Sequence, residues 1–319
     1  MNKLPKVLVD LPLPSFLGEL LTPFCVTIPW DWLDGRSGEE LRQVEGVYTY
    51  AHPLIDEAFL RRLPALKVVS NFGVGVDHID LKAAAAQHIP IGNTPGVLDG
   101  ATADLTLALL LACARNVVVG DRFARSPEFT TFDPGRWLGL EVFGSTLGIV
   151  GLGRIGKQVA RRARAFDMRV LYHNRRRDTR AEEELGVECA GLNELLEQSH
   201  FVSLNLPLTA ETTGMIGEAE LRRMRPDAIL INVARGPVVQ TSALVRALEE
   251  KWIAGAGLDV TDPEPLPRAH ALLRLNNVVL TPHLGSATVR TRRRMGEMAA
   301  ANLQAGLEGR PLPYAVATE

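Results

Sequence analysis

The stretch "LGIVGLGRIGKQVARRARAFDMRVLYHNRRRD", residues Leu147–Asp178, indicates the fold class. An apolar run leads into Gly151-x-Gly153-x-x-Gly156, then a helical pattern and a second apolar run follow. In a strand–turn–helix–strand unit, the first glycine makes the turn, the second lets the backbone approach a pyrophosphate, and the third packs the helix on the strand. The positive helix N-terminus then faces the phosphates. This context predicts a dinucleotide site; a tight turn that binds nothing is the alternative.

The end of the second apolar run carries an unusual polar sequence. Asn174 stands about 20 residues after the glycines, where NAD-binding units place an acid on the ribose 2′-hydroxyl. Arg175, Arg176 and Arg177 follow it. Guanidinium groups pair with phosphate in a bidentate fork, whereas a carboxylate would repel it. The run therefore favours NADP(H) over NAD(H), with Arg175 and Arg176 nearest the strand; a solvated basic turn is the alternative.

Strand and helix patterns alternate along the chain. Nine short runs rich in β-branched residues predict strands: "KVLVD", "GVYTY", "LKVVS", "LGIVG", "MRVLYH", "FVSLNL", "AILINV", "GAGLDV" and "NNVVLTP". Strands that alternate with helices are typical of parallel sheets built from βαβ units. Nine strands suit two sheets better than one, so we expect an α/β fold with two doubly wound parallel sheets.

Two long helical segments, residues 101–126 and 287–309, begin where glycine and proline punctuation ends. We interpret both as crossings between domains. Because only a short tail follows the second segment, the tail is expected to fold back onto the first domain. The predicted organisation is a discontinuous outer domain, residues 1–98 and 288–319, with a nucleotide-binding domain, residues 99–287, inserted into it.

Composition argues against several classes of protein. The 319 residues are 46% hydrophobic and 23% charged, as in a folded globular protein with two domains. A net charge of -2 gives no overall field for nucleic acid or an anionic membrane surface. The apolar run at 105–119 is interrupted by polar residues, so no membrane span is expected. Cys25, Cys113 and Cys189 form no metal-ligand or disulfide pattern, which favours a cytoplasmic protein without a metal.

Several motifs together resemble those of the D-isomer-specific 2-hydroxyacid dehydrogenases, in the same order and near the same spacing. They are "NFGVGVDHID" (71–80), "GNTPGVLDGATADLTLALLL" (92–111), "GLGRIG" (151–156), "NLPLTAETTGMIG" (205–217), "INVARGPVV" (231–239), "GLDVTDPEP" (257–265) and "TPHLGSAT" (281–288). The sequence is most similar to the glyoxylate/hydroxypyruvate reductase branch. The resemblance implies Rossmann-like and flavodoxin-like domains with the cofactor cleft between them, NADPH-preferring reduction of hydroxypyruvate or glyoxylate, and a homodimer.

Reduction of a 2-keto acid requires a nicotinamide, a cation that orients the carboxylate and an acid that protonates the alkoxide. The resemblance assigns substrate orientation to Arg235, the acid/base role to His283, and the role of carboxylate partner to Glu264. Histidine changes its charge near neutral pH, and an adjacent carboxylate stabilises the charged form. The alternatives are a surface arginine, a buried structural histidine and a surface acid in a proline turn.

Other positions are carried over from the same motifs. The resemblance places Val74, Gly75 and Ser286 at the substrate, with the backbone amides of Val74 and Gly75 holding its carboxylate. It places further residues at the cofactor: Thr106, Arg154, Ile155, Pro207, Thr212, Val233, Asp259 and Gly285. A plain glycine turn at 74–75, a turn-capping Asp259 and a helix-face Thr106 are the alternatives.

Polar side chains in "GVYTYAHPLID" bear on the substrate. Tyr48, Tyr50 and His52 lie in a segment that lines the substrate mouth in the family. A phenol and an imidazole could hydrogen-bond hydroxyls at the distal end of hydroxypyruvate, or of a sugar acid such as 2-ketogluconate. The tyrosines could instead be ordinary strand residues, and His52 a turn residue. Trp137 either reaches a neighbouring subunit's site or packs in a core.

A protein of a different class could carry the same nucleotide motif. Corepressors built on this fold sense NAD(H) and bind protein partners, so a dinucleotide loop alone does not identify an enzyme. The set of Arg235, Glu264 and His283 favours catalysis. A sensor would bind NADPH tightly and reduce no keto acid.

Overall fold

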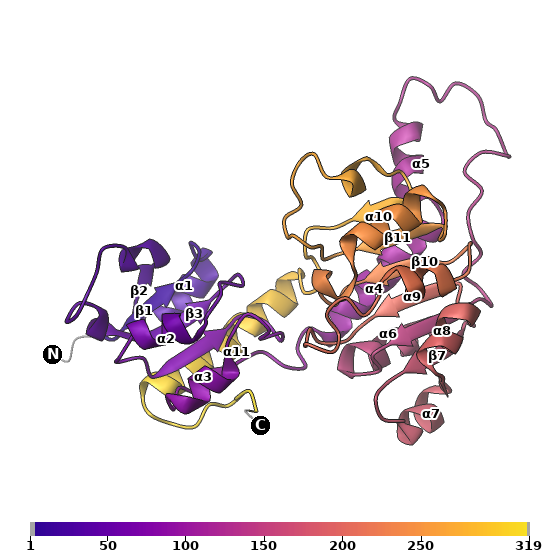
Figure 1. The fold of residues 1–319 in the computed structure, drawn as a ribbon. Coiled ribbons are helices and arrows are strands. Elements are labelled where there is room, and N and C mark those ends of the chain that lie inside the picture. The colour runs from indigo at the N-terminus through magenta and orange to yellow at the C-terminus, as the bar shows by residue number, and fades with distance from the viewer. Residues whose placement is uncertain (1–3, 318–319) are drawn as a thin grey trace. The chain divides into compact units, whose positions relative to one another are not determined.

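The structure, a computed structural model, describes residues 4–317. The chain divides into two compact units. The split unit holds the chain up to Leu98 and from Thr288 onward, and the central unit is Asp99–Ala287. Each unit is built on its own parallel sheet (Figure 1).

The split unit is a five-stranded parallel sheet with helices. Its strands are β1 (Lys6–Val9), β2 (Val26–Pro29), β3 (Val44–Thr49), β4 (Val68–Asn71) and β5 (Ile91–Gly92). Its helices are α1 (Ser15–Leu21), η1 (Trp30–Leu33), η2 (Leu41–Gln43), α2 (Glu57–Arg62), α3 (Leu81–Ala86) and α11 (Val289–Leu307). The strand order β2-β1-β3-β4-β5 is the flavodoxin-like order. Helix α11 packs against β3 and β4, and Ser70 Oγ donates to Ala299 O at 2.7 Å.

The central unit has a seven-stranded parallel sheet in the order β12-β11-β10-β9-β6-β7-β8. The strands are β6 (Thr146–Val150), β7 (Arg169–His173), β8 (Glu188–Cys189), β9 (Phe201–Leu204), β10 (Ile229–Asn232), β11 (Gly255–Leu258) and β12 (Val278–Leu280). The helices are α4 (Asp99–Ala114), α5 (Val117–Ala124), α6 (Arg154–Arg164), α7 (Thr179–Leu185), α8 (Leu192–Gln198), α9 (Glu218–Arg223), η3 (Gly236–Val238), α10 (Thr241–Glu249) and η4 (Ala271–Arg274). The chain order reverses between β9 and β6, the point at which doubly wound sheets bind ligands.

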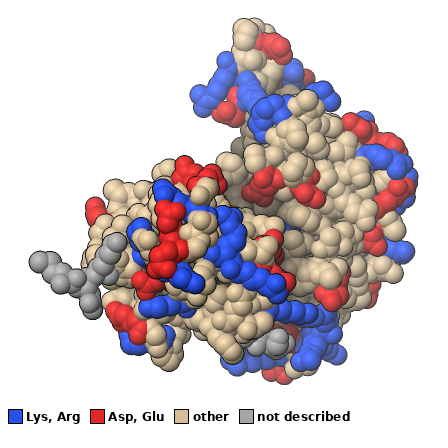
Figure 2. Space-filling model, turned by 60° about the vertical axis from the view of Figure 1, so that its left-hand side comes forward, with Lys and Arg blue, Asp and Glu red and all other residues tan. Residues whose placement is uncertain are grey.

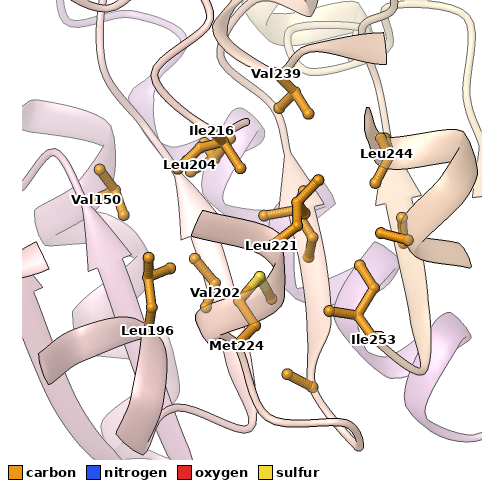
Figure 3. Packing of buried hydrophobic residues seen from close by; sticks show 14 of the residues in the cluster. Val150, Leu196, Val202, Leu204, Ile216, Leu221, Met224, Val239, Leu244 and Ile253 are labelled. Atoms are coloured by element: carbon orange, nitrogen blue, oxygen red, sulfur yellow. The ribbon is translucent and has the colours of Figure 1, made fainter. Parts of the chain in front are cut away.

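Helices cover both faces of this sheet. Successive strand residues point to opposite faces, so Ile149 joins the core under α4 and α6 while Val150 joins the core under α8, α9 and α10. Figure 3 shows the second core, where Val202 from β9 lies among Leu196, Leu221 and Met224. Because both faces are buried, the strands read as nearly continuous apolar runs. The predicted α/β class with two parallel sheets is confirmed.

Local differences from the sequence predictions have physical causes. The single helix expected at 101–126 is wrong: α4 and α5 meet at an angle of 61°. Asn116 breaks the helix with φ 52, a left-handed conformation that asparagine tolerates better than most residues. Strands β2, β5 and β8 were not predicted. β5 and β8 have two residues each, and β2 is an edge strand with mostly exposed side chains, so none carries a long apolar pattern.

Charged side chains of both signs are interspersed on the face that Figure 2 shows. Several arginines pair with an acid one helical turn away, such as Arg125 with Asp121 and Arg180 with Glu184. Exposed pairs of this kind contribute about 0–1 kcal/mol to stability. Within residues 4–317 no single helix is long and apolar enough to cross a membrane, and only the bent pair α4–α5 meets that test jointly.

Candidate active site

The three proposed catalytic residues follow neighbouring strands of the central unit. Arg235 follows β10, Glu264 follows β11 and His283 follows β12. The three strands pair in parallel, β10 with β11 and β11 with β12. Their carboxyl ends therefore lie at one edge of the sheet, which is where open parallel sheets bind ligands.

His283 and Glu264 form a hydrogen-bonded pair. Nδ1 of His283 lies 2.8 Å from Oε1 of Glu264, and both side chains are partly exposed, at 32% and 39%. A carboxylate at Nδ1 fixes the orientation of the ring. A histidine oriented in this way suits proton transfer through Nε2.

The loop that carries His283 is anchored by a buried carboxylate. His283 has φ 56, a strained conformation for a residue with a side chain. Its backbone N–H donates to the carbonyl of Asp259 at 2.9 Å. Asp259 is 2% exposed, and its carboxylate accepts hydrogen bonds from Thr281 Oγ1 (2.6 Å), Leu284 N (2.6 Å) and Gly285 N (2.8 Å). These donors, on both sides of His283, hold the loop in place, so Asp259 has a structural task in addition to the cofactor role predicted for it.

The loop that carries Arg235 is fixed on both sides of that residue. Asn232 Nδ2 donates to Arg235 O at 2.9 Å, and Asn232 Oδ1 accepts from Ala234 N at 3.0 Å. A Cβ on Gly236 would lie only 2.0 Å from Thr261 O, so only glycine allows this contact. The loop after β10 therefore presses directly on the segment that leads to Glu264. Arg235 itself is half-buried, and its Nη1 donates to Ala234 O at 2.9 Å.

The glycine loop lies after β6, beside the point where the strand order reverses. Gly151 has φ 97, and a Cβ on Gly156 would lie 2.3 Å from Gly151 O, so protein geometry requires both glycines. Gly153 differs, because among the described residues no atom lies within 4 Å of the position its Cβ would take. Packing leaves this position open for a ligand. Helix α6 begins there without an acidic residue in its first turn, and the loop therefore fits a pyrophosphate.

The three arginines after β7 have different surroundings. Asn174 Oδ1 accepts a hydrogen bond from Leu152 N at 2.7 Å, which ties the end of β7 to the glycine loop. Arg177 holds Glu182 through Nε at 2.9 Å and Nη2 at 2.7 Å. Hydrogen bonds from Arg177 and then from Tyr172 hold the pKa of Glu182 below its ordinary value. Arg175 and Arg176 are exposed and stand nearer the strand end.

A second loop lies close enough to Arg175 for their charges to interact. A hydrogen bond from Thr209 lowers the pKa of Glu211, and the charge of Arg175 acts in the same direction. In this loop Thr212 Oγ1 donates to Pro207 O at 2.7 Å. The two loop positions predicted to lie at the adenosine side are therefore in contact with each other.

The remaining predicted cofactor positions of the central unit lie near the same edge or behind it. Thr106 is fully buried in α4, where its hydroxyl donates to Thr102 O at 2.8 Å. Arg154 Nε bonds Asp99 Oδ2 at 2.9 Å. Gly285 and Val233 are buried, whereas Ile155 is half-buried, as is Ser286, which was predicted to lie at the substrate.

In the split unit, Val74 and Gly75 form part of the loop that follows β4, and both are half-buried. Aromatic and basic side chains lie around this loop. The ring of Phe72 lies 5.0 Å from the ring of Tyr50 and 5.7 Å from the guanidinium of Arg292. The ring of His52 lies 4.9 Å from that of His78.

Tyr48 is a core residue, and a role for it at the substrate is wrong. Its side chain is fully buried, and burial raises the pKa of its phenol. Tyr50, one strand period later, is half-buried, and Asp10 accepts from its backbone N–H at 2.7 Å. Packing of Trp137 in a core is also wrong, because its side chain is 43% exposed.

The sequence analysis did not single out three residues that border the loop 73–75: Asn71 and Asn93, whose side chains donate to its carbonyl groups, and Arg292, which lies against Phe72. Arg292 lies in a run of arginines at the start of α11, where the helix dipole disfavours cations. That local conflict was a signal in the sequence. The two asparagines follow ordinary strand patterns and carried no such signal.

The chain is similar to known proteins along most of its length. Residues 107–285 match the model of the D-isomer specific 2-hydroxyacid dehydrogenase, NAD binding domain. The glyoxylate reductase of Pyrococcus furiosus is 49% identical over 285 residues, which are 88% of this chain and 84% of that protein. The glyoxylate reductase of Aeropyrum pernix is 45% identical, with 99% and 97% covered. The structure of the NADPH-dependent glyoxylate/hydroxypyruvate reductase of Sinorhizobium meliloti in complex with NADP and malonate superposes with a TM-score of 0.89, at 34% identity, with 99% and 97% covered.

The fold, the nucleotide loop and these similarities define an NAD(P)-dependent oxidoreductase. The chain belongs to the D-isomer-specific 2-hydroxyacid dehydrogenase family, in the branch of the glyoxylate reductases. The resemblance inferred from the sequence motifs is confirmed.

Proposed function

We propose that this protein reduces a small 2-keto acid, hydroxypyruvate or glyoxylate, to the D-2-hydroxy acid with NADPH. The observation that carries the proposal is the 2.8 Å pair of His283 and Glu264, which follow β12 and β11, beside the strand β10 that leads to Arg235 in the order β12-β11-β10. The relatives named as glyoxylate reductases support it. The Sinorhizobium meliloti reductase that binds NADP supports the choice of cofactor.

Each catalytic residue has one task in this reaction. NADPH, when bound, supplies a hydride to the carbonyl carbon. Arg235 pairs with the carboxylate and polarises the keto group. His283 donates a proton from Nε2 to the developing alkoxide, and Glu264 stabilises the imidazolium at Nδ1. In the reverse oxidation, neutral His283 accepts the proton from the hydroxyl group.

The residues around the glycine loop fit the cofactor. Gly153 and the first amides of α6, at Arg154 and Ile155, face the pyrophosphate in this proposal, and the open space at Gly153 supports it. Asn174, Arg175 and Arg176 take the phosphorylated ribose. Other assigned positions remain predictions: Pro207 and Thr212 at the adenosine, and Thr106, Val233, Asp259 and Gly285 toward the nicotinamide.

The two units take different tasks in the proposal. The central unit is the nucleotide-binding domain, and the split unit binds the substrate through the amides of Val74 and Gly75. Tyr50 and His52 form hydrogen bonds with the hydroxyl group of hydroxypyruvate. Their contacts with Phe72 and His78, on either side of the loop 73–75, support this role. Ser286 stays a predicted substrate contact.

An apolar surface supports a homodimer formed through the central unit. The segment after α5 exposes Phe129 (50%), Phe132 (79%), Leu138 (78%) and Phe143 (67%). Exposed apolar side chains that gather on one segment mark an interaction site. Trp137 belongs to the same segment. A mass of two chains in sedimentation equilibrium is expected.

The first test compares initial rates of NADPH and NADH oxidation with hydroxypyruvate and with glyoxylate. We expect turnover with a preference for NADPH of about tenfold or more, which corresponds to about 1.4 kcal/mol. Equal rates with the two cofactors would refute the preference for NADPH but would still support the assignment as a keto acid reductase. Tight NADPH binding without turnover of either acid would refute the reductase and favour a nucleotide sensor.

We expect Arg175→Gln and Arg176→Gln to raise KM for NADPH by about tenfold to a hundredfold, because each removes a charged hydrogen bond worth about 1.5–3 kcal/mol. KM for NADH should not change. Arg177→Gln is the matched control, because Arg177 already holds Glu182. The NADPH/NADH ratio of kcat/KM measures the effect. An unchanged ratio in the double variant of Arg175 and Arg176 would contradict this assignment.

A further inference from the structure

Two asparagines hold three consecutive carbonyl groups of the loop 73–75 in the split unit. Asn71 Nδ2 donates to the first carbonyl at 3.0 Å and to the third at 2.9 Å. Asn93 Nδ2 donates to the second at 2.8 Å. Asn71 ends β4 and Asn93 follows β5, the neighbouring strand of the sheet. The loop is therefore held from two strand ends.

Anchored carbonyls determine where the amide hydrogens point. The C=O and N–H of one trans peptide point in opposite directions, and these peptides are not among the cis bonds of the chain. The amides of Val74, Gly75 and Val76 therefore point away from the two asparagines. In the described part of the chain, these amides donate to no protein group. Successive backbone N–H groups of this kind form a site for an anion.

Thr49 determines which way the amide of Asn71 faces. Thr49 and Asn71 are paired in register across β3 and β4, and both are fully buried. Thr49 Oγ1 donates to Asn71 Oδ1 at 2.7 Å. Because the hydroxyl group occupies the amide oxygen, the NH₂ group is directed to the loop carbonyls.

We propose that Asn71, oriented by Thr49, and Asn93 are positioning residues for the carboxylate of the substrate. They hold the loop 73–75 with its amide groups directed outward, so that three N–H donors bind one carboxylate. The inference rests on the proposed function. It identifies the side chains that hold the carboxylate-binding loop of the substrate site in position. The inference requires a substrate that carries a carboxylate group, and it does not depend on the rest of the substrate.

The test uses oxamate, an unreactive analogue of a 2-keto acid, on the full-length protein saturated with NADPH. Asn71→Ala is expected to raise the Kd for oxamate and KM for glyoxylate by about tenfold to a hundredfold. The Kd for NADPH should not change, and kcat at saturating glyoxylate should fall much less than KM rises. A merely structural role would instead lower kcat, NADPH affinity and Tm together.

Matched variants separate positioning from folding. Asn277 also donates Nδ2 to two backbone carbonyls, Leu248 O at 3.3 Å and Ala254 O at 3.2 Å, but neither belongs to the loop 73–75 or to a residue assigned to the site, so Asn277→Ala should leave oxamate binding unchanged. Thr49→Val removes the orienting hydroxyl and should weaken oxamate binding, whereas Thr49→Ser keeps it and should restore the binding. If Asn71→Ala does not fold, the comparison of oxamate binding between Thr49→Val and Thr49→Ser tests the inference instead.

The outcomes distinguish this inference from the proposed function. Turnover by the natural protein, with oxamate binding unaffected in Asn71→Ala and Thr49→Val, would overturn the inference alone. Oxamate binding that is lost in these variants, in a protein that reduces no keto acid, would support the inference and overturn the reductase.

Discussion

Replacing His283 by asparagine is expected to lower kcat for glyoxylate reduction by about 10²–10⁴, the contribution of a positioned proton donor. Asparagine cannot donate a proton to the alkoxide. It does tolerate the left-handed backbone that His283 adopts at φ 56, so the loop should keep its shape. Steady-state rates with NADPH, and NADPH affinity measured by fluorescence, separate chemistry from binding.

The chain supplies a control for the backbone itself. His88 is exposed in the split unit and has the same φ of 56, so His88→Asn makes the same change at a residue that has no assigned role in the site. It should leave kcat unchanged. A kcat for His283→Asn close to that of the natural protein would remove His283 from the mechanism.

Glu264→Gln tests the partner of His283 through the pH profile. Glutamine can hold the ring but does not stabilise the imidazolium, so the alkaline limb of kcat/KM for reduction should move to lower pH. His283→Asn should lose that limb. An alkaline limb that stays in place in Glu264→Gln would contradict the proposed role of the 2.8 Å pair.

Arg235→Gln is expected to lower kcat/KM for glyoxylate by about 10²–10³, or about 2.7–4 kcal/mol, the cost of removing one donor to a developing oxyanion. In this variant the substrate loses the guanidinium that both pairs with its carboxylate and polarises its keto group. Arg235→Lys should recover only part of the loss, because an ammonium group cannot form the bidentate fork. NADPH affinity should not change in either variant.

Arg268 is the matched control for Arg235. It lies after the same strand as Glu264, and its Nη2 donates to a backbone carbonyl, Leu266 O, at 2.6 Å. Arg268→Gln should change kcat/KM no more than the substitution of an ordinary surface residue does. An equal loss in the Arg235 and Arg268 variants would show that general charge, and not a bound carboxylate, determines the rate.

The sequence alone determined the fold class and the edge of the sheet at which the proposed catalytic residues lie. Runs such as "AILINV" and "NNVVLTP" carry strand periodicity locally, and the residues just after a strand lie at its carboxyl end. Arg235, Glu264 and His283 could therefore be assigned to this edge from the local pattern and the motifs around them. The glycine loop was equally local, because the requirements at Gly151 and Gly156 arise within one turn and one helix.

Only the tertiary structure showed which hydrogen-bond partners orient the side chains and loops of the proposed site. The anchoring of the His283 loop by Asp259, the hydrogen bond of Asn93 to the loop 73–75, and that of Thr49 to Asn71 all join residues brought together by the fold. The burial of Tyr48 likewise depends on what packs over its strand. A local pattern records period and turn, whereas a hydrogen-bond partner is set by the register and packing of separate strands. For that reason the sequence located the proposed catalytic side chains, and the fold determined what orients them.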